Sequence, residues 1–384
     1  MNDLYFTLSD YEREAISFRT FSERVAQDEI IILNGALSSV AVGHGLGLRI
    51  NSSIGLNSPS DYSTEENKII SISRHETHPH IMMDLSTVKV NTPLYSSIRE
   101  NIGCPVGTIP HYLCFDPERG IDDTLLLETI EEQAASGVAF MTLHLTANLE
   151  LAERALTRSI PIISRGGSLI LRDLKANQRK ENVLQRNLGK IISILKKHNV
   201  AVSIGTTFRP STQHDALDDV HLAEIKMQKE IGMYLKQQGI RVMMEGIGHI
   251  AFNKIPDFVS LLRENMYIPF MPLGPIVSDR TNGQDHITSS IGASYIASLN
   301  GADIINAVTR EEHTGGIPTI HSILEAIDAA ASVVKIVDEC RFPEFFQKTR
   351  PIYHNCLGTT EIVGCTRCSN KCPFIWNEQE RTTQ

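Results

Sequence analysis

The chain has 384 residues, 41% hydrophobic and 21% charged, so it can bury one large core or two modest ones without disulfides. Its formal net charge of −9 argues against nucleic acid as the main partner, because binding a phosphate backbone requires clustered Lys and Arg. The first twenty residues lack a secretory pattern and no apolar run reaches eighteen residues, so we expect a cytoplasmic protein without a membrane span.

Short apolar runs alternate with longer amphipathic segments along most of the chain. The eight runs predicted as strands are 47–51, 81–86, 105–112, 138–146, 160–165, 200–208, 240–246 and 267–273. Helical periodicity lies between several of them, at 122–136, 181–198, 218–238 and 256–265. Repeated βα units predict the α/β class and a (β/α)8 TIM-like barrel, with a doubly wound open sheet as the alternative.

The chain divides into three predicted parts. Residues 1–45 form an N-terminal arm and residues 46–340 form the barrel, which is the catalytic domain. The barrel is expected to end in one long helix from about 318 to 339. From 341 to 384 the sequence is rich in Pro and Cys and weakly periodic, which indicates an appended C-terminal arm.

Polar residues stand at the ends of the predicted strands. They are Asp84, His144, Ser164, Arg165, Arg209, Glu245 and His249. In a β/α barrel the carboxyl ends of the strands carry the active site, and an open sheet binds ligands at the same ends. We therefore expect these side chains to surround a site.

Three short motifs contain candidate ligand-binding groups. The turn S-R-G-G-S from Ser164 could cradle a phosphate, with Arg209 adding charge, or could be a tight turn with a salt bridge. His249, in E-G-I-G-H, and His313 are each either a metal ligand or a hydrogen-bonded core group. The stretch R-H-E-T-H-P-H, residues 74–80, is interpreted as a solvated loop rather than a metal site.

The C-terminal arm carries the sharpest pattern, C-T-R-C-S-N-K-C-P, with Cys365, Cys368 and Cys372. Three thiolates at this spacing can hold three irons of a 4Fe-4S cluster and leave the fourth iron open. The alternative is a zinc knuckle completed by Cys356 or His354. If Cys356 is instead a fourth cluster ligand, the cluster only carries electrons.

Seven stretches, in this order, resemble the phosphomethylpyrimidine synthase family, the thiamine pyrimidine synthases among the radical S-adenosylmethionine enzymes. They are M-D-L-S-T from Met83, P-V-G-T-I-P from Pro105, S-R-G-G-S from Ser164, E-G-I-G-H from Glu245, L-G-P from Leu273, D-H-I-T-S-S-I-G-A from Asp285 and the cysteine triplet. The resemblance runs from about residue 49 to 372.

The resemblance implies a homodimeric barrel enzyme, a carbon-carbon lyase that cleaves S-adenosylmethionine with a 4Fe-4S cluster. Its radical rearranges aminoimidazole ribotide into hydroxymethylpyrimidine phosphate, with electrons from a donor such as flavodoxin or ferredoxin. The implied catalytic residues are Glu245 and the three cysteines, and His249 and His313 are the implied zinc ligands. The implied nucleotide-binding residues are Ser53, Met83, Tyr112, His144, Ser164, Arg165, Gly166, Thr206, Arg209, Glu245 and Met271.

The chain departs from the family pattern at several positions. The cysteine motif is one residue shorter, Ser53 stands at a substrate-contacting Asn, Thr206 replaces an acidic residue and Met271 replaces a Tyr. A site built to hydrogen-bond one group discriminates strongly by its presence. The sequence therefore allows two alternatives, a paralogue that makes another product from the same or a related ribotide, such as hydroxybenzimidazole for cobamides, and a non-enzymatic iron-sulfur or zinc protein.

Overall fold

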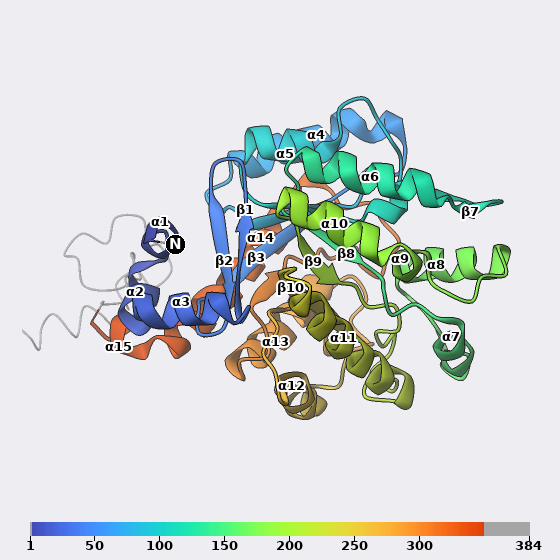
Figure 1. Ribbon diagram of the computed structural model, residues 1–384. Coiled ribbons are helices and arrows are strands. Elements are labelled where there is room, and N and C mark those ends of the chain that lie inside the picture. Colours follow the sequence, from blue (N-terminus) through green and yellow to red (C-terminus); the bar gives the residue numbers. More distant parts are fainter. Residues whose placement is uncertain (1, 349–384) are drawn as a thin grey trace, which may run out of the picture. The chain divides into compact units, whose positions relative to one another are not determined.

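Eight parallel strands form the central sheet of the structure, a computed structural model that describes residues 2–348 (Figure 1). They are β3 (Arg49–Ile54), β4 (Ile81–Asp84), β5 (Val106–Thr108), β8 (Phe140–Leu143), β9 (Ala201–Ile204), β10 (Val242–His249), β11 (Phe270–Ile276) and β12 (Ile304–Asn306). From β3 to β11, strands adjacent in this order pair in the sheet, and β12 pairs with β3, so that β11 and β12 are the two edge strands. The amide of Asp303 donates to the Phe270 carbonyl at 2.9 Å, which links the edges at β11 and β12. The sheet is thus nearly closed, and the predicted barrel is confirmed over the open sheet.

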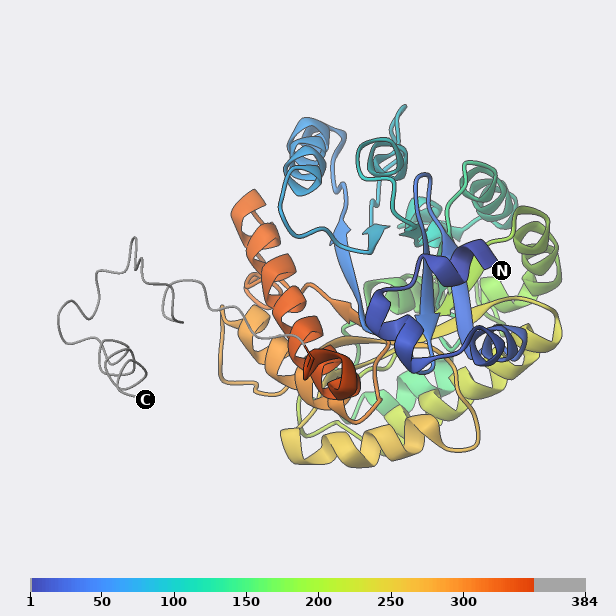
Figure 2. The same cartoon turned by 90° about the vertical axis from the view of Figure 1, so that its left-hand side faces the viewer.

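Helices surround the strands and connect each to the next, and they form a ring in Figure 2. The main ones are α4 (Tyr62–Ser73), α5 (Leu94–Asn101), α6 (Asp123–Ala135), α10 (Leu188–His198), α11 (Asp219–Gln237), α12 (Ile255–Arg263), α13 (Asp285–Ser298) and α14 (Ile320–Arg341). The connection from β8 to β9 also contains α7 (Leu149–Ala155), α8 (Arg165–Ala176) and α9 (Val183–Arg186). Short elements are η1 (Pro59–Asp61), η2 (Pro110–Leu113), η3 (Phe252–Lys254), β6 (Phe115–Asp116) and β7 (Gly120–Ile121).

One of the eight predicted strands is wrong. Residues 160–165 form no strand, Ile160 is 49% exposed, and Ser164 is instead the N-cap of α8. The strand that completes the barrel is β12, whose three residues gave too short a signal to predict. The run 105–112 is also interrupted, because Pro110 begins η2 soon after β5 ends.

The N-terminal residues, set apart above as an arm, pack on the barrel. They contain α1 (Asn2–Phe6), α2 (Asp10–Ala15), α3 (Phe18–Ala26) and the antiparallel hairpin of β1 (Ile30–Asn34) and β2 (Ser39–Gly43). Ile31, Leu33 and Val42 of the hairpin join one buried cluster with Ile81 and Met243 of the barrel strands. Figure 2 shows these N-terminal elements across one end of the ring of helices. Met1–Arg341 accordingly form one compact unit.

The second unit, Phe342–Gln384, contains α15 (Pro343–Phe346) in its described part. The predicted cluster ligands Cys365, Cys368 and Cys372 lie outside the described residues, as do Cys356 and His354.

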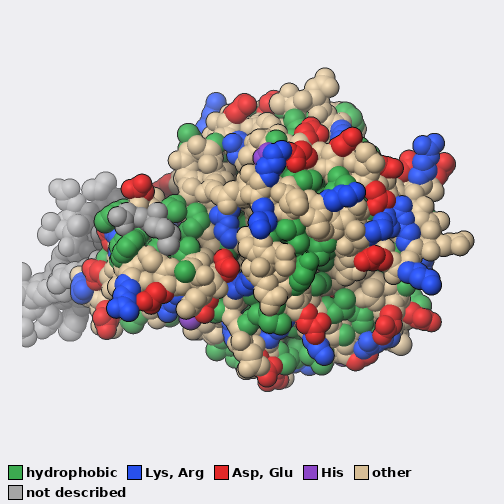
Figure 3. Space-filling view, in the orientation of Figure 1, with side chains coloured by type: hydrophobic (Ala, Val, Ile, Leu, Met, Phe, Trp, Pro, Cys, Tyr) green, Lys and Arg blue, Asp and Glu red, His purple; other side chains and the backbone are tan. Residues whose placement is uncertain are grey.

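No helix of residues 2–348 has the length and apolarity needed to cross a membrane. On the face shown in Figure 3, Lys and Arg side chains are interspersed with Asp and Glu.

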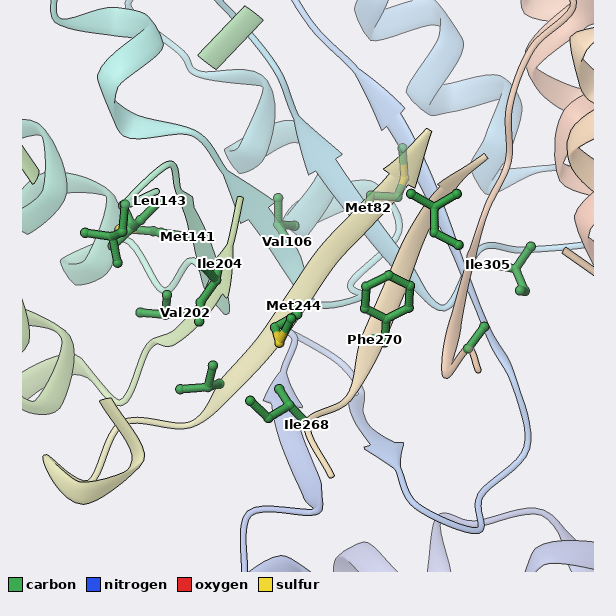
Figure 4. Close-up of a cluster of buried hydrophobic side chains, with 14 of the residues drawn as sticks. Met82, Val106, Met141, Leu143, Val202, Ile204, Met244, Ile268, Phe270 and Ile305 are labelled. Atoms are coloured by element: carbon green, nitrogen blue, oxygen red, sulfur yellow. The ribbon is translucent and has the colours of Figure 1, made fainter. Parts of the chain in front are cut away.

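The strands bury side chains on both faces, as expected for a parallel sheet covered by helices. Residues such as Met82, Val202 and Met244 pack in the cluster between strands and helices (Figure 4). Their neighbours Met83 and Met243 belong to the separate cluster inside the barrel, because successive residues of a strand point to opposite faces. Polar side chains join this interior cluster toward the carboxyl ends of the strands, where the candidate site begins.

Candidate active site

Glu245 on β10 is a buried carboxylate with a fixed orientation. Its Oε1 accepts hydrogen bonds from Thr142 Oγ1 of β8 at 2.7 Å and from Ser203 Oγ of the adjacent strand β9 at 2.8 Å. Burial raises the pKa of Glu245, whereas these two hydrogen bonds and the charge of Arg209 oppose the rise. The side chain is thereby held inside the barrel, with one oxygen anchored by two strands.

Tyr112, Arg165, Arg209 and Glu245 form one electrostatic group. The guanidinium carbon of Arg165 lies 5.7 Å from the centroid of the Tyr112 ring. Burial raises the pKa of Tyr112 to about 12, although Arg165 and Arg209 lower it and Glu245 adds to the rise. Three residues predicted at strand ends, Arg165, Arg209 and Glu245, therefore interact in the fold with Tyr112, which the family resemblance implied.

The S-R-G-G-S turn begins helix α8. Ser164 caps this helix by accepting a hydrogen bond at Oγ from the Gly167 amide at 3.1 Å. A Cβ on Gly166 would come within 2.3 Å of Cε1 of His144, so a glycine is required for this close approach. The first-turn amides of a helix and an adjacent Arg favour an anion, which fits the predicted phosphate cradle.

Methionine side chains form the apolar part of the same region. Met83 and Met271 lie in the interior cluster together with Tyr112, and both are buried. Ser53 pairs with Met83 across β3 and β4 and is partly exposed. These three predicted residues lie on adjoining parts of the barrel interior or its rim.

Thr206 directs its hydroxyl into the barrel wall. Thr206 Oγ1 donates to Glu224 Oε2 of α11 at 2.6 Å, and the side chain is almost completely buried. Glu224 also accepts hydrogen bonds from Thr146 Oγ1 at 2.6 Å and from the amides of Thr207 and Phe208 at 2.6 and 2.8 Å. The position at which the resemblance implies an acidic residue is thus occupied by a hydroxyl that donates to a neighbouring helix.

His249 and His313 meet through their Nε2 atoms, which lie 3.0 Å apart. The other ring nitrogen of His249, Nδ1, lies 2.7 Å from Asp279 Oδ1, and Nδ1 of His313 lies 3.0 Å from Asp285 Oδ1. If each Nδ1 donates its proton to a carboxylate, both Nε2 atoms present lone pairs to each other. Two facing lone pairs require a cation or a proton between them.

The chemistry of this donor set suits zinc. Paired imidazoles whose second nitrogens are held by carboxylates are a common zinc environment. Within residues 2–348 no group of three or more His, Cys, Asp or Glu side chains is arranged to hold a metal ion. Among the described residues, His249 and His313 are thus the two side chains whose facing nitrogens could hold such an ion.

Comparison of the sequence with protein families identifies the family of this chain. The profile of the Radical SAM ThiC family matches residues 9–350. The chain belongs to the radical SAM ThiC family. The resemblance inferred from the seven stretches is therefore confirmed.

Three relatives of this radical SAM ThiC family member are all named phosphomethylpyrimidine synthase. The one from Carboxydothermus hydrogenoformans is 32% identical over 83% of this chain and 77% of its own length. The one from Saccharolobus islandicus is 30% identical over 94% of this chain and 92% of its own. The one from Ignicoccus hospitalis is 32% identical over 88% and 84%.

Several polar residues at this ThiC-family site carry no obvious sequence signal. Asp285 lies in a family stretch, but its contact with His313 depends on the fold, as does that of Asp279 with His249. Glu224 is hidden within the amphipathic pattern of α11. His111, the one polar side chain between Ile109 and Leu113 apart from Tyr112, is fully buried beside the site. A polar residue inside an apolar run was the available clue to His111.

Proposed function

We propose that this chain is a radical S-adenosylmethionine enzyme that rearranges an aminoimidazole ribotide-like nucleotide, as in hydroxymethylpyrimidine phosphate synthesis for thiamine. Family membership and relatives named phosphomethylpyrimidine synthase support this activity. The observation that carries the proposal is the grouping of the α8 turn, Arg165, Arg209 and Glu245 around Tyr112. This group combines a place for an anion with a buried acceptor for a heterocycle.

The phosphate of the nucleotide is assigned to the α8 turn. Ser164 fixes the helix start, Gly166 lets the backbone approach the site, and Arg165 is exposed with its guanidinium near Tyr112. Arg209 supplies a second positive charge, which also acts on His144 and Glu245. A dianion placed here would meet helix amides and two guanidinium groups.

The heterocycle is assigned to the side of Glu245. Thr142 and Ser203 both donate to Oε1 of this carboxylate, so Oε2 is the oxygen available to accept an N–H from an amino-bearing ring. Met83, Met271 and Tyr112 provide the apolar surface beside it. A substrate held at both ends would have its reacting hydrogens fixed relative to the barrel.

We assign a zinc ion, or another divalent metal, to His249 and His313. When bound, such an ion would act as a Lewis acid or a template for substrate oxygen and nitrogen atoms. Asp279 and Asp285 would set the orientation of the two rings and keep Nε2 of each deprotonated. Gly248, beside His249, lies against Arg209, which brings the imidazole pair next to the phosphate-binding group.

We assign the 4Fe-4S cluster to Cys365, Cys368 and Cys372, supported by the family and by the spacing of the motif. When bound, the cluster supplies the electron that cleaves S-adenosylmethionine, and a flavodoxin or ferredoxin would deliver it. The barrel's own residues then bind and orient the nucleotide and exclude water from it. We further propose a cytoplasmic homodimer that has neither nucleic acid nor membrane as a partner.

A paralogous activity is the second candidate, because of the contact between Thr206 and Glu224. A carboxylate at position 206 could accept from an amino-bearing ring, whereas the hydroxyl of Thr206 already donates to Glu224. Together with Ser53 and Met271, this change alters groups that face the heterocycle and leaves the phosphate-binding turn intact. Such a pattern would suit a different product from the same or a related ribotide.

The test is anaerobic reconstitution with iron and sulfide, followed by incubation with aminoimidazole ribotide, S-adenosylmethionine and dithionite. Hydroxymethylpyrimidine phosphate detected by mass supports the proposal, and another product from the ribotide supports the paralogue. Glu245→Gln should keep the bonds from Thr142 and Ser203 at its remaining oxygen yet lower kcat/KM by about a hundredfold. A reconstituted protein that forms no 5′-deoxyadenosine would leave the non-enzymatic alternative.

A further inference from the structure

Two buried imidazoles lie behind the phosphate-binding turn, and one of them has no assigned role. His111, in η2, is fully buried, and neither Nδ1 nor Nε2 makes a hydrogen bond of normal geometry among the described residues, although the ring lies close to the backbone of Gly166. Nδ1 of His144 is likewise sealed and unpartnered within that part of the chain. The two ring centroids lie 5.1 Å apart with an angle of 79° between the planes, an edge-to-face contact.

This arrangement is costly for a purely structural core. A buried donor or acceptor without a partner loses its hydration and gains nothing in return. A phenyl ring of similar shape would fill the position of His111 without this cost. Buried polar groups without partners are uncommon in native proteins, and a functional role is one reason for keeping such a residue.

The position of the pair connects it to the anion-binding turn. The His144 ring lies between two glycines, because a Cβ on Gly166 would come within 2.3 Å of it and a Cβ on Gly205 within 3.0 Å. Burial lowers the pKa of His111 to about 3, and a hydrogen-bond contact with the Gly166 backbone, outside normal geometry, opposes this effect. Burial also lowers the pKa of His144 well below its usual value, with His111 and Arg209 adding to the effect. Both rings are therefore neutral, and each offers one N–H and one lone pair.

We propose that His111 is a positioning residue that holds His144 against the Ser164–Gly166 turn and thereby sets the affinity for the ribose phosphate end of the nucleotide. The contact of the two rings fixes the orientation of His144, and the close approach of Gly166 carries that orientation to the turn. The inference rests on the proposed function, because it takes a ribotide as the ligand. It assigns a role to a residue outside the set that the family resemblance implies.

The experiment compares His111→Phe with the wild-type full chain after reconstitution, without reductant so that no turnover occurs. Isothermal titration with aminoimidazole ribotide and with ribose 5-phosphate gives the affinities, and thermal unfolding gives the stability. We expect the variant to bind both ligands about tenfold more weakly, by the same factor, because they share the ribose phosphate. We also expect its ligand-free melting temperature to stay the same or rise, since the unpartnered nitrogens are gone.

His221→Phe is the matched control. His221 is a buried, neutral imidazole on α11 whose pKa is lowered by burial to about 3, but its Nδ1 accepts a hydrogen bond from the Leu217 amide at 3.1 Å. This variant should melt at a lower temperature, because that amide loses its acceptor, and should bind both ligands normally. We thus expect His221→Phe to lose stability and keep binding, and His111→Phe to lose binding and keep stability.

Unchanged ribotide affinity in a folded His111→Phe protein would overturn the inference and leave the proposed function standing. A wild-type protein that binds neither ligand would overturn both. If His111→Phe does not fold, His111→Leu, which also lacks ring nitrogens, is measured with the same expectation. Weaker binding of the ribotide with normal binding of ribose 5-phosphate would also contradict the inference, because the effect would then lie at the heterocycle.

Discussion

The hydroxyl of Thr206 lies 2.6 Å from the Glu224 carboxylate and joins the loop after β9 to helix α11. Glu224 is fully buried, and it collects four donors from Thr146, Thr206, Thr207 and Phe208. Burial raises the pKa of Glu224, while these hydrogen bonds oppose the rise. The Glu224 carboxylate thus holds the loop that carries Arg209, together with Arg158, which donates to the Phe208 carbonyl at 2.8 Å.

Glu224→Gln should destabilise the barrel. Each carboxylate oxygen accepts two hydrogen bonds, and the amide nitrogen of Gln would face donors that include a backbone N–H. We expect the free energy of unfolding to fall by about 2–3 kcal/mol, measured as a lower urea midpoint. Glu230→Gln, at an exposed position of the same helix, is the control and should unfold like the wild type. Equal midpoints for the two variants would contradict the role of Glu224.

Asp285→Asn should weaken metal binding. Asp285 Oδ1 lies 3.0 Å from Nδ1 of His313, and Oδ2 accepts the His313 amide at 3.2 Å. Loss of an orienting carboxylate beside a metal-bound imidazole typically reduces affinity about 10–100-fold. Titration of the metal-free protein with zinc against a chelator measures this change, and Asp257→Asn on α12 should have no effect. A zinc affinity that Asp285→Asn leaves intact would remove the imidazole pair from consideration as a zinc site.

Stability should decrease as the pH falls, and His80 should account for part of the decrease. His80 Nδ1 accepts the Ile50 amide at 2.9 Å, and burial, followed by the charge of Arg49, lowers the pKa of His80 to about 4. A lowered pKa means that the neutral ring is favoured in the fold, so its contribution is present above about pH 6.5 and is lost as the pH falls toward 4. The expectation of a solvated loop at residues 74–80 was therefore wrong for His80.

His80→Gln tests this assignment. Between pH 7 and pH 5 the wild type should lose about 2 kcal/mol more stability than the variant, since the unfolded chain gains a proton that the folded His80 refuses. Urea unfolding at the two pH values gives the difference. His111 and His221 retain their own acid sensitivity in both proteins. An identical pH dependence in wild type and variant would show that His80 is not held neutral by the fold.

Leu33→Ala should be severely destabilising although it lies within the predicted N-terminal arm. Leu33 is fully buried in the cluster inside the barrel, so its truncation leaves a cavity there. We expect a loss of about 2–5 kcal/mol, measured by urea or thermal unfolding. Leu37→Ala, four residues along the same hairpin, is the control, because Leu37 is 82% exposed and should change stability by less than about 0.5 kcal/mol. Matching losses would mean that the hairpin does not pack as described.

The sequence pattern predicted most of the barrel, because seven of its eight strands overlap runs that were predicted as strands. The prediction failed where an apolar run is exposed to solvent and where a strand is very short. Ile160 belongs to an apolar run but is 49% exposed, and β12 is only three residues long. The strand-end rule found Glu245 and Arg209, whose positions follow from local sequence.

Sequence patterns could not predict contacts between side chains that are far apart in the chain and meet only in the fold. His249 and Asp279 are thirty residues apart, and their contact exists only because β10 and the loop after β11 meet. His111 reads as an interruption of an apolar run, and its neighbour His144 lies on another strand end. For the cysteine motif the sequence remains the basis of the prediction, because those residues lie outside the described part.

The hairpin of β1 and β2 covers one end of the barrel. Ile31, Leu33 and Val42 pack with residues at the amino ends of the barrel strands, such as Ile81 and Ala201, whereas the candidate site lies at the carboxyl ends. Under the proposed function, substrate and product would therefore enter and leave from the same end of the barrel. Accumulated product should accordingly act as a competitive inhibitor of the nucleotide.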